Sequence, residues 1–160
     1  MRRVSLWLIV LLILAVFWLT LPEKIDDNWA SGEVVRVIDG DSIVIQQAEM
    51  QVEIRLIGID APEFGQPYFV AAKEFLSSHV SPGSSIYYTQ EIPQKDVYNR
   101  LLVHAFTSPN LPFDESLNLK LVAAGLAIVP DYPDKSIYYD KLKWWQDYAQ
   151  KNKLGVHSDT

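Results

Sequence analysis

The sequence contains no cysteine among its 160 residues. This absence excludes disulfide bonds, thiolate metal ligands and a thiol nucleophile. It leaves the compartment open, because a secreted protein can also lack disulfides. A surplus of basic residues is missing too, since the formal net charge is -6 and every acidic residue lies from Glu23 onward. Attraction of nucleic acid by overall charge is therefore excluded, and a nucleic-acid function would depend on a local site with a cation.

One long apolar run is present, at the N-terminus. Residues Leu6 to Leu21 read LWLIVLLILAVFWLTL, and Arg2 and Arg3 precede them. As a helix this run is slightly short for a bilayer core of about 30 Å, and the two residues before it extend it. No small-x-small cleavage site follows, so we expect an uncleaved signal anchor over residues 1–22, with secretion after cleavage as the alternative. The positive-inside rule then predicts a membrane-anchored domain that is extracytoplasmic, either periplasmic or extracellular.

The remainder is predicted to be a polar linker over residues 23–31 and one domain over residues 32–157. Alternation and turn signals predict short strands at Glu33–Asp39, Ser42–Gln47, Gln51–Ile59, Ser85–Thr89 and Arg100–Thr107. Helical patterns cover Gln66–His79, Phe113–Ala124 and Ser136–Lys151. Five strands with one helix after the third and two at the end predict an α+β fold built on a partly open, five-stranded OB-fold barrel.

The first segment with chemical interest is VIDGDSIVI, residues Val37 to Ile45. Asp-Gly between two β-branched runs predicts a hairpin turn, and a turn accounts for Gly40. It does not account for the two carboxylates, Asp39 and Asp41, at the mouth of a strand. Asp41 is a candidate metal ligand, whereas Asp39 either shapes the turn or holds a metal-bound water.

Two further segments, RLIGIDAPE and DVYNRLL, carry the complementary groups. A hard divalent cation takes oxygen ligands, and Asp41 and Asp60 can supply them from neighbouring strand ends. Phosphodiester cleavage also needs an aligned water and stabilisation of negative charge at phosphorus. Arg55 and Arg100 suit the second task, because a guanidinium group pairs with two phosphate oxygens. Glu63 remains to activate or position the water.

Each of these residues also has an ordinary structural explanation. Asp-Gly alone is usually only a turn, and an arginine on a strand usually faces solvent. Asp60 and Glu63 around a proline are ordinary loop polarity, and Arg100 after Tyr98-Asn99 can close a second hairpin with Asn99 at positive φ. The order of the three segments is more specific than any single residue.

Together the three segments resemble the thermonuclease family, the staphylococcal-nuclease-like domains. The resemblance runs from about Gly32 to Val156 and includes the motifs DGD-S, RL-x-GID-x-PE and D-x-Y-x-R-L. It implies a five-stranded OB-like barrel with three helices. It also implies a calcium-dependent (Ca2+) nuclease of DNA and RNA that leaves 3′-phosphates.

The resemblance assigns roles to individual positions. Asp41, Asp60 and the Ala61 carbonyl match the calcium ligands of the family, and Arg55, Glu63 and Arg100 match its three catalytic positions.

Substrate contacts are less well matched. The loop after Glu63 lacks lysines, and Asn99 stands where a glycine is frequent. Tyr98, Lys95 and Tyr132 are the remaining candidates for contact with a nucleic acid. The resemblance therefore predicts the chemistry more fully than the grip on the substrate.

The sequence as a whole predicts a monomeric, membrane-anchored, calcium-dependent phosphodiesterase whose partners are DNA and RNA. A non-catalytic OB-type module that binds nucleic acid or protein at the membrane surface is the alternative. A third interpretation is a domain that binds calcium for stability only. The complete set of acids and arginines favours the enzyme.

Overall fold

The computed structural model describes residues 29–131 and 136–158. The predicted anchor and most of the predicted linker lie outside these ranges, and so does Tyr132. Within them, no helix combines the length and the apolar character that crossing a membrane requires.

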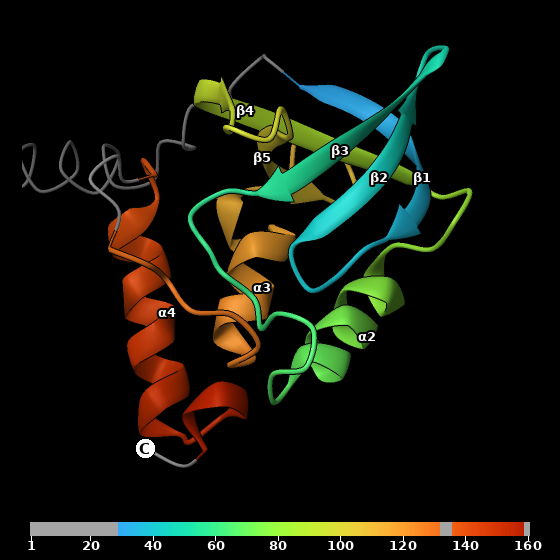
Figure 1. Ribbon diagram of the computed structural model, residues 1–160. Coiled ribbons are helices and arrows are strands. Elements are labelled where there is room, and N and C mark those ends of the chain that lie inside the picture. The colour runs from blue at the N-terminus through green and yellow to red at the C-terminus, as the bar shows by residue number, and fades with distance from the viewer. Residues whose placement is uncertain (1–28, 132–135, 159–160) are drawn as a thin grey trace, which may run out of the picture.

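Five strands form a closed barrel in the order β1-β2-β3-β5-β4 (Figure 1). The pairs are antiparallel except for β3 with β5, which are parallel. The sequence predicted a partly open barrel. Closure comes from β1, because its first half pairs with β4, its second half pairs with β2, and the register shifts between Val34 and Arg36. Such an irregularity bends a strand and lets it serve two neighbours. The strands are β1 Ala30–Val37, β2 Ser42–Gln47, β3 Met50–Leu56, β4 Ser85–Lys95 and β5 Leu101–Phe106.

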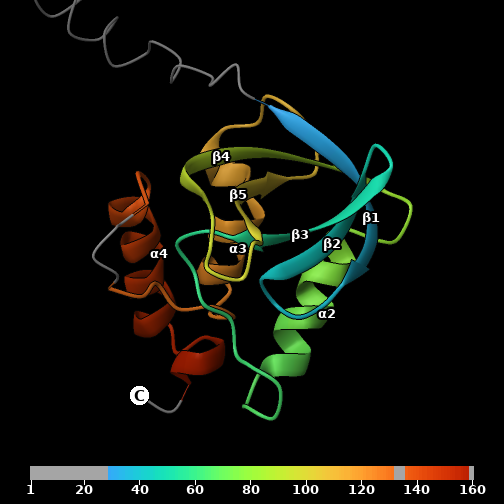
Figure 2. The same cartoon turned by 45° about the horizontal axis from the view of Figure 1, so that its top comes forward.

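The helices gather at one end and one side of the barrel (Figure 2). Helix α3 contacts α2, α4 and strand β5, so it occupies the centre of the helical layer. The predicted helix over Phe113–Ala124 is divided, because Ser116 ends one short helix and caps the next by accepting a hydrogen bond from the Leu119 amide at 3.2 Å. The helices are α2 Phe69–His79, η1 Phe113–Glu115, α3 Leu117–Ala123, α4 Tyr139–Lys151 and η2 Gly155–His157.

The barrel interior is filled by alternate residues of the strands. Ile54 and Leu56 of β3 are fully buried, as the predicted alternation requires, and Ile43 and Ile45 of β2 lie beside them. Burial of one such side chain stabilises the fold by about 1.5–3 kcal/mol. Packing of these side chains in the barrel interior fixes β2 and β3, and thereby the positions of the residues at the strand ends.

Candidate active site

Strand register brings Asp41 next to Arg55. Ser42, the first residue of β2, is paired with Arg55 near the end of β3. The Leu56 amide donates to the Asp41 carbonyl at 2.8 Å, which extends this pairing by one step. The two side chains therefore meet at one end of the barrel although they are 14 residues apart.

Gly40 lets the turn before β2 approach its neighbours. Its φ is not positive, so the predicted turn does not by itself explain the glycine. A Cβ at this position would lie 2.6 Å from the Cβ of Ala72 in α2 and 2.7 Å from the Cβ of Ala61. Close packing, and not a left-handed conformation, is therefore the reason for glycine here. It brings Asp41 against the chain that carries Asp60.

Asp60 is positioned from the opposite side. After β3 the chain turns at Gly58, which has a φ of +79° that suits glycine. Asp60 and Ile128 then exchange two backbone hydrogen bonds, of 2.8 and 2.9 Å. These two hydrogen bonds fix the backbone of Asp60 just after the end of β3.

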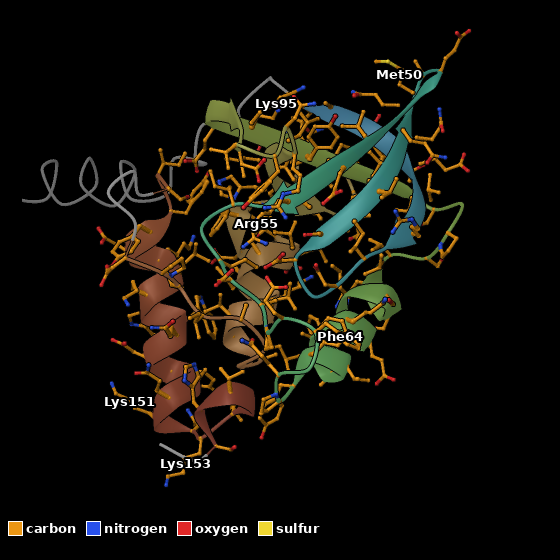
Figure 3. The ribbon with its side chains drawn as sticks, viewed as in Figure 1. Met50, Arg55, Phe64, Lys95, Lys151 and Lys153 are labelled. Carbon is orange, nitrogen blue, oxygen red and sulfur yellow. The ribbon has the colours of Figure 1, made fainter. Side chains whose placement is uncertain are left out.

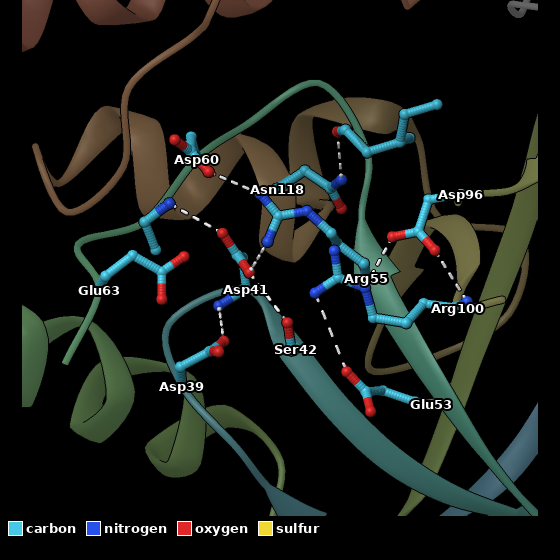
Figure 4. Close-up of polar contacts among 12 residues, drawn as sticks. Asp39, Asp41, Ser42, Glu53, Arg55, Asp60, Glu63, Asp96, Arg100 and Asn118 are labelled. Carbon is cyan, nitrogen blue, oxygen red and sulfur yellow. Dashed lines mark hydrogen bonds and ion pairs between the residues drawn. The ribbon is translucent and has the colours of Figure 1, made fainter. Parts of the chain in front are cut away.

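Arg55 joins the two carboxylates (Figure 4). One of its terminal nitrogens donates to Oδ1 of Asp41, and the other donates to Oδ1 of Asp60 at 2.6 Å. Oδ1 of Asp41 also accepts the Ser42 hydroxyl at 3.0 Å, and Oδ2 accepts the Ala61 amide at 2.8 Å. The structure thus brings together Asp41, Arg55, Asp60 and Ala61, as the sequence predicted.

The charge at this cluster is unbalanced. Burial raises the pKa of Asp41 from 3.8 to about 6, although Arg55 and the Ala61 amide both act to lower it. The nearby Asp39, whose Oδ1 accepts the Asp41 amide at 3.0 Å, raises it further. Two carboxylates therefore share one guanidinium group, and Asp39 lies next to one of them.

Arg100 forms ion pairs with two acidic residues other than Asp41 and Asp60. Its Nε donates to Oδ2 of Asp96 at 2.7 Å, and a terminal nitrogen lies 3.9 Å from Glu53 on β3. In Figure 4 the side chain extends toward Arg55. Asp96 also accepts the backbone amides of Tyr98 and Arg100, both at 2.9 Å. Burial acts to raise the pKa of Asp96, but these hydrogen bonds and the charge of Arg100 outweigh it, so that pKa is below the ordinary value.

The other predicted residues lie at the rim. Glu63 is exposed, and among the described residues its carboxylate has no hydrogen-bond partner, while its backbone amide donates to Oε1 of Gln66 at 2.8 Å. Tyr98 is 78% exposed, and its ring lies 5.4 Å from the Arg100 guanidinium carbon.

Lys95 is the last residue of β4, directly before the turn that leads to β5. Its ammonium group donates to Oδ1 of Asn99 at 2.9 Å. Asn99 has a φ of 66°, which confirms the predicted left-handed residue in this turn.

Sequence reasoning missed Asn118 of α3. Its side chain is fully buried and bonds three backbone groups: the carbonyls of Ile57 at 2.9 Å and Val103 at 3.1 Å, and the amide of Ala105 at 3.0 Å. These bonds join the exit of β3 to β5, and thereby the segment of Asp60 to the strand that follows Arg100. The signal in the sequence was an asparagine within the mostly apolar segment LNLKLVA.

The donor atoms fit a hard cation. Among the described residues, no group of three or more His, Asp or Glu side chains is close enough to form a metal site by side chains alone. Asp41 and Asp60 nevertheless lie within the span of one guanidinium group, and the Ala61 backbone is adjacent. Two carboxylates, a carbonyl and water are ligands of the kind that calcium accepts.

Comparison with known proteins agrees with this geometry. A family model described as "Staphylococcal nuclease homologue" matches residues 53–159. The chain belongs to this family. The matched range includes Arg55, Asp60, Glu63 and Arg100 and begins after Asp41; the roles of these residues stay predictions.

Individual members of the staphylococcal nuclease family resemble the chain over most of their length. The Thermonuclease of Staphylococcus intermedius is 33% identical over 144 residues, which cover 84% of this chain and 82% of that protein. The Thermonuclease of Staphylococcus hyicus is 30% identical, with 82% and 78% covered. An Uncharacterized endonuclease of Escherichia coli O157:H7 is 34% identical, with 80% and 77% covered.

Proposed function

We propose that this protein is a nuclease that hydrolyses phosphodiester bonds of DNA and RNA. The observation that carries the proposal is the bridge that Arg55 makes between Asp41 and Asp60 at the end of a closed barrel. Glu63 and Arg100 lie on the chain segments next to this bridge. Membership in the staphylococcal nuclease family, together with relatives named thermonuclease and endonuclease, supports the same conclusion.

Calcium is the proposed cofactor. Asp41, Asp60 and the Ala61 carbonyl are the groups that would hold it, and the bound ion would offset the negative charge that develops at phosphorus. A site of two carboxylates and one carbonyl is weak, which suits the millimolar calcium found outside the cytoplasm.

Three side chains of the protein then have separate roles in the reaction. Glu63 accepts a proton from a water molecule, whose oxygen forms a bond to phosphorus. Arg55 and Arg100 bind the non-bridging oxygens and stabilise the extra charge. The bond from phosphorus to the 5′ oxygen breaks, that oxygen takes up a proton, and the product keeps a 3′-phosphate.

Arg55 is bound by two carboxylates that compete with a phosphate for its guanidinium group. Both of its terminal nitrogens are engaged by Asp41 and Asp60. Neutralising either carboxylate weakens its hold on the guanidinium group, which then becomes available to the substrate. The two roles of this cluster, cation binding and phosphate binding, are therefore coupled through one arginine.

We also propose that the domain is anchored by residues 1–22 and faces the outside of the membrane. The support is the sequence alone: an apolar run that is slightly short of bilayer length, with Arg2 and Arg3 before it. Fractionation of cells, with protease added to intact cells or spheroplasts, tests both points. Recovery in the soluble fraction would contradict the anchor, and resistance of a membrane-bound chain to protease would contradict its orientation.

A nuclease assay tests the activity. The full-length protein in mild detergent should degrade single-stranded DNA and RNA when calcium is present and should stop when a calcium chelator is added. Glu63→Gln provides a matched inactive variant. Binding of nucleic acid without cleavage would favour the non-catalytic module, and thermal stabilisation by calcium without cleavage would favour a structural ion.

A further inference from the structure

A pocket of about 510 Å³ opens beside the candidate active site. Asp60 and Ala61 belong to both: they take part in the carboxylate cluster and also line this pocket. A volume of this size is within the range of pockets that take small organic ligands. Any group that occupies it lies next to the place where a phosphate would bind.

Apolar groups form most of its wall. Pro62 and Pro67 come from the connection between β3 and α2, Tyr68 from the start of α2, and Ile128 and Val156 from the C-terminal part of the chain. Within the part of the chain that the structure describes, neither lysine nor arginine lines the pocket. A phosphate or a sugar-phosphate backbone would therefore find no basic side chain on these walls, whereas a flat uncharged ring would be well matched.

We propose that this pocket, named here the Tyr68 pocket, binds one nucleobase of the substrate strand next to the scissile phosphate. The proposal rests on the proposed nuclease activity and adds a subsite to it. Continuity through Asp60 and Ala61 argues for a base that is attached to the bound phosphate, and not for an unrelated ligand. Stacking of a base on an aromatic side chain contributes about 1–3 kcal/mol and tolerates any sequence.

The backbone of Tyr68 supports this role. Its φ is 67° and its ψ is 0°, a left-handed conformation that is costly for a residue with a side chain. Its hydroxyl is hydrogen-bonded to the Ser158 hydroxyl at 2.8 Å. Strained residues of this kind cluster at ligand-binding positions. Tyr68 thus combines a left-handed backbone with a place in the pocket wall.

Gln66 connects the pocket to Glu63. Its Oε1 accepts the Glu63 amide at 2.8 Å, and its amide nitrogen has no partner among the described residues. Gln66 lines the pocket, and its side-chain amide N–H groups can donate to a carbonyl or ring nitrogen of a base. Figure 3 labels Phe64 on the chain segment that joins β3 to α2. A bound base therefore acts on the loop that positions Glu63.

A defined oligonucleotide tests the proposal. It has one cleavable linkage, and it is compared with two derivatives that lack the base on one or the other side of that linkage. For the wild-type protein with calcium, removal of one of the two bases should raise KM by about 5–150-fold, which corresponds to the stacking energy above. The full-length protein in detergent is used throughout.

Variants of the pocket locate the effect. Tyr68→Ala should raise KM for the intact oligonucleotide by a similar factor and should lose the difference between the intact and the base-free substrate. Ile128→Trp, which fills the pocket, should do the same, whereas Tyr68→Phe keeps the ring and should keep the difference. Val70→Ala is the matched control, because Val70 is 62% exposed on α2 and does not line the pocket.

The outcomes separate two failures. If the wild type distinguishes the substrates but Tyr68→Ala and Ile128→Trp distinguish them equally well, the base binds elsewhere and the proposal for the pocket is wrong. Equal KM values for all three substrates with the wild type would also overturn it. If the wild type cleaves none of the substrates, it is the proposed nuclease activity that fails.

Discussion

Asp41 and Arg55 form an ion pair between β2 and β3 in which the carboxylate side chain is only 3% exposed and the arginine side chain 14%. The same guanidinium group also binds Asp60, so it compensates two acids at once. Any cation that binds the two carboxylates competes with Arg55 for them. This competition makes the arginine a measurable part of calcium binding as well as of catalysis.

The first prediction concerns removal of that arginine. In the presence of a chelator, Arg55→Ala should lower the free energy of unfolding by about 3 kcal/mol, because it leaves the Asp41 carboxylate buried without a positive partner. It should also increase the affinity for calcium while abolishing nuclease activity, since the two carboxylates are then free for the ion. Urea unfolding and the shift of Tm with calcium concentration measure both effects.

Arg36→Ala is the control for this experiment, because Arg36 is exposed on β1. It should leave stability and the calcium response unchanged. If Arg55→Ala binds calcium no more tightly than the wild type, the arginine does not compete for the carboxylates that bind the ion.

The second prediction concerns Glu63, whose carboxylate is exposed and has no hydrogen-bond partner among the described residues. Glu63→Gln should lower kcat by about 100-fold or more, the range for loss of a general base. Stability should change by less than about 0.5 kcal/mol, as for other surface positions. Steady-state kinetics and thermal unfolding are the measurements, with the exposed Glu74→Gln on α2 as a control that should retain activity. A normal kcat in Glu63→Gln would remove the assigned role.

The third prediction is a pH dependence away from the site. Oε1 of Glu91 accepts hydrogen bonds from His104 on β5 and from the Ser136 hydroxyl at 2.7 Å, and Oε2 accepts the Ile137 amide at 3.1 Å. Burial acts to raise the pKa of Glu91, but these hydrogen bonds outweigh it, so the pKa lies below the ordinary 4.5. The ionised carboxylate therefore stabilises the fold fully at pH values above 4.5. This contribution is lost as the pH falls through the lowered pKa of the folded protein.

Glu91→Gln should accordingly be less stable than the wild type by about 2 kcal/mol at pH 7. The difference should shrink steadily below pH 4.5, the ordinary pKa of this group. Urea unfolding of both proteins across this range measures it, with the exposed Glu49→Gln as a control. A difference that stays constant with pH would show that ionisation of Glu91 does not contribute.

The parts of the site that the sequence predicted depend on short-range patterns. β2 occupies Ser42–Gln47 as predicted, because the turn and the β-branched run define its two ends. Arg55 and Asp60 are only five residues apart, so their proximity follows from one strand and its exit. The motif spacing was sufficient wherever the partners lie on adjacent segments of the chain.

Other features depend on contacts that no local pattern contains. β4 extends to Lys95, well beyond the predicted end at Thr89, because β5 supplies a partner for it. Glu53 contacts Arg100 only because β3 and β5 are parallel neighbours. The Tyr68 pocket needs Ile128, which is brought to Asp60 by a backbone bridge across the molecule. Such relationships require the closed barrel to be known first.

The last prediction returns to the turn before Asp41. Gly40→Ala places a methyl group 2.6 Å from Ala72 and 2.7 Å from Ala61, so one of the backbones must move. We expect a loss of about 2 kcal/mol, as for other overpacked sites, and a weaker Tm shift with calcium, since the turn is pushed away from the Ala61 amide that binds Asp41. Gly83→Ala is the control, because open space surrounds Gly83 and its φ of +84° costs only local strain. It should lose some stability and keep the calcium response of the wild type. If both variants keep that response, the close approach at Gly40 serves packing alone and does not position the metal ligand.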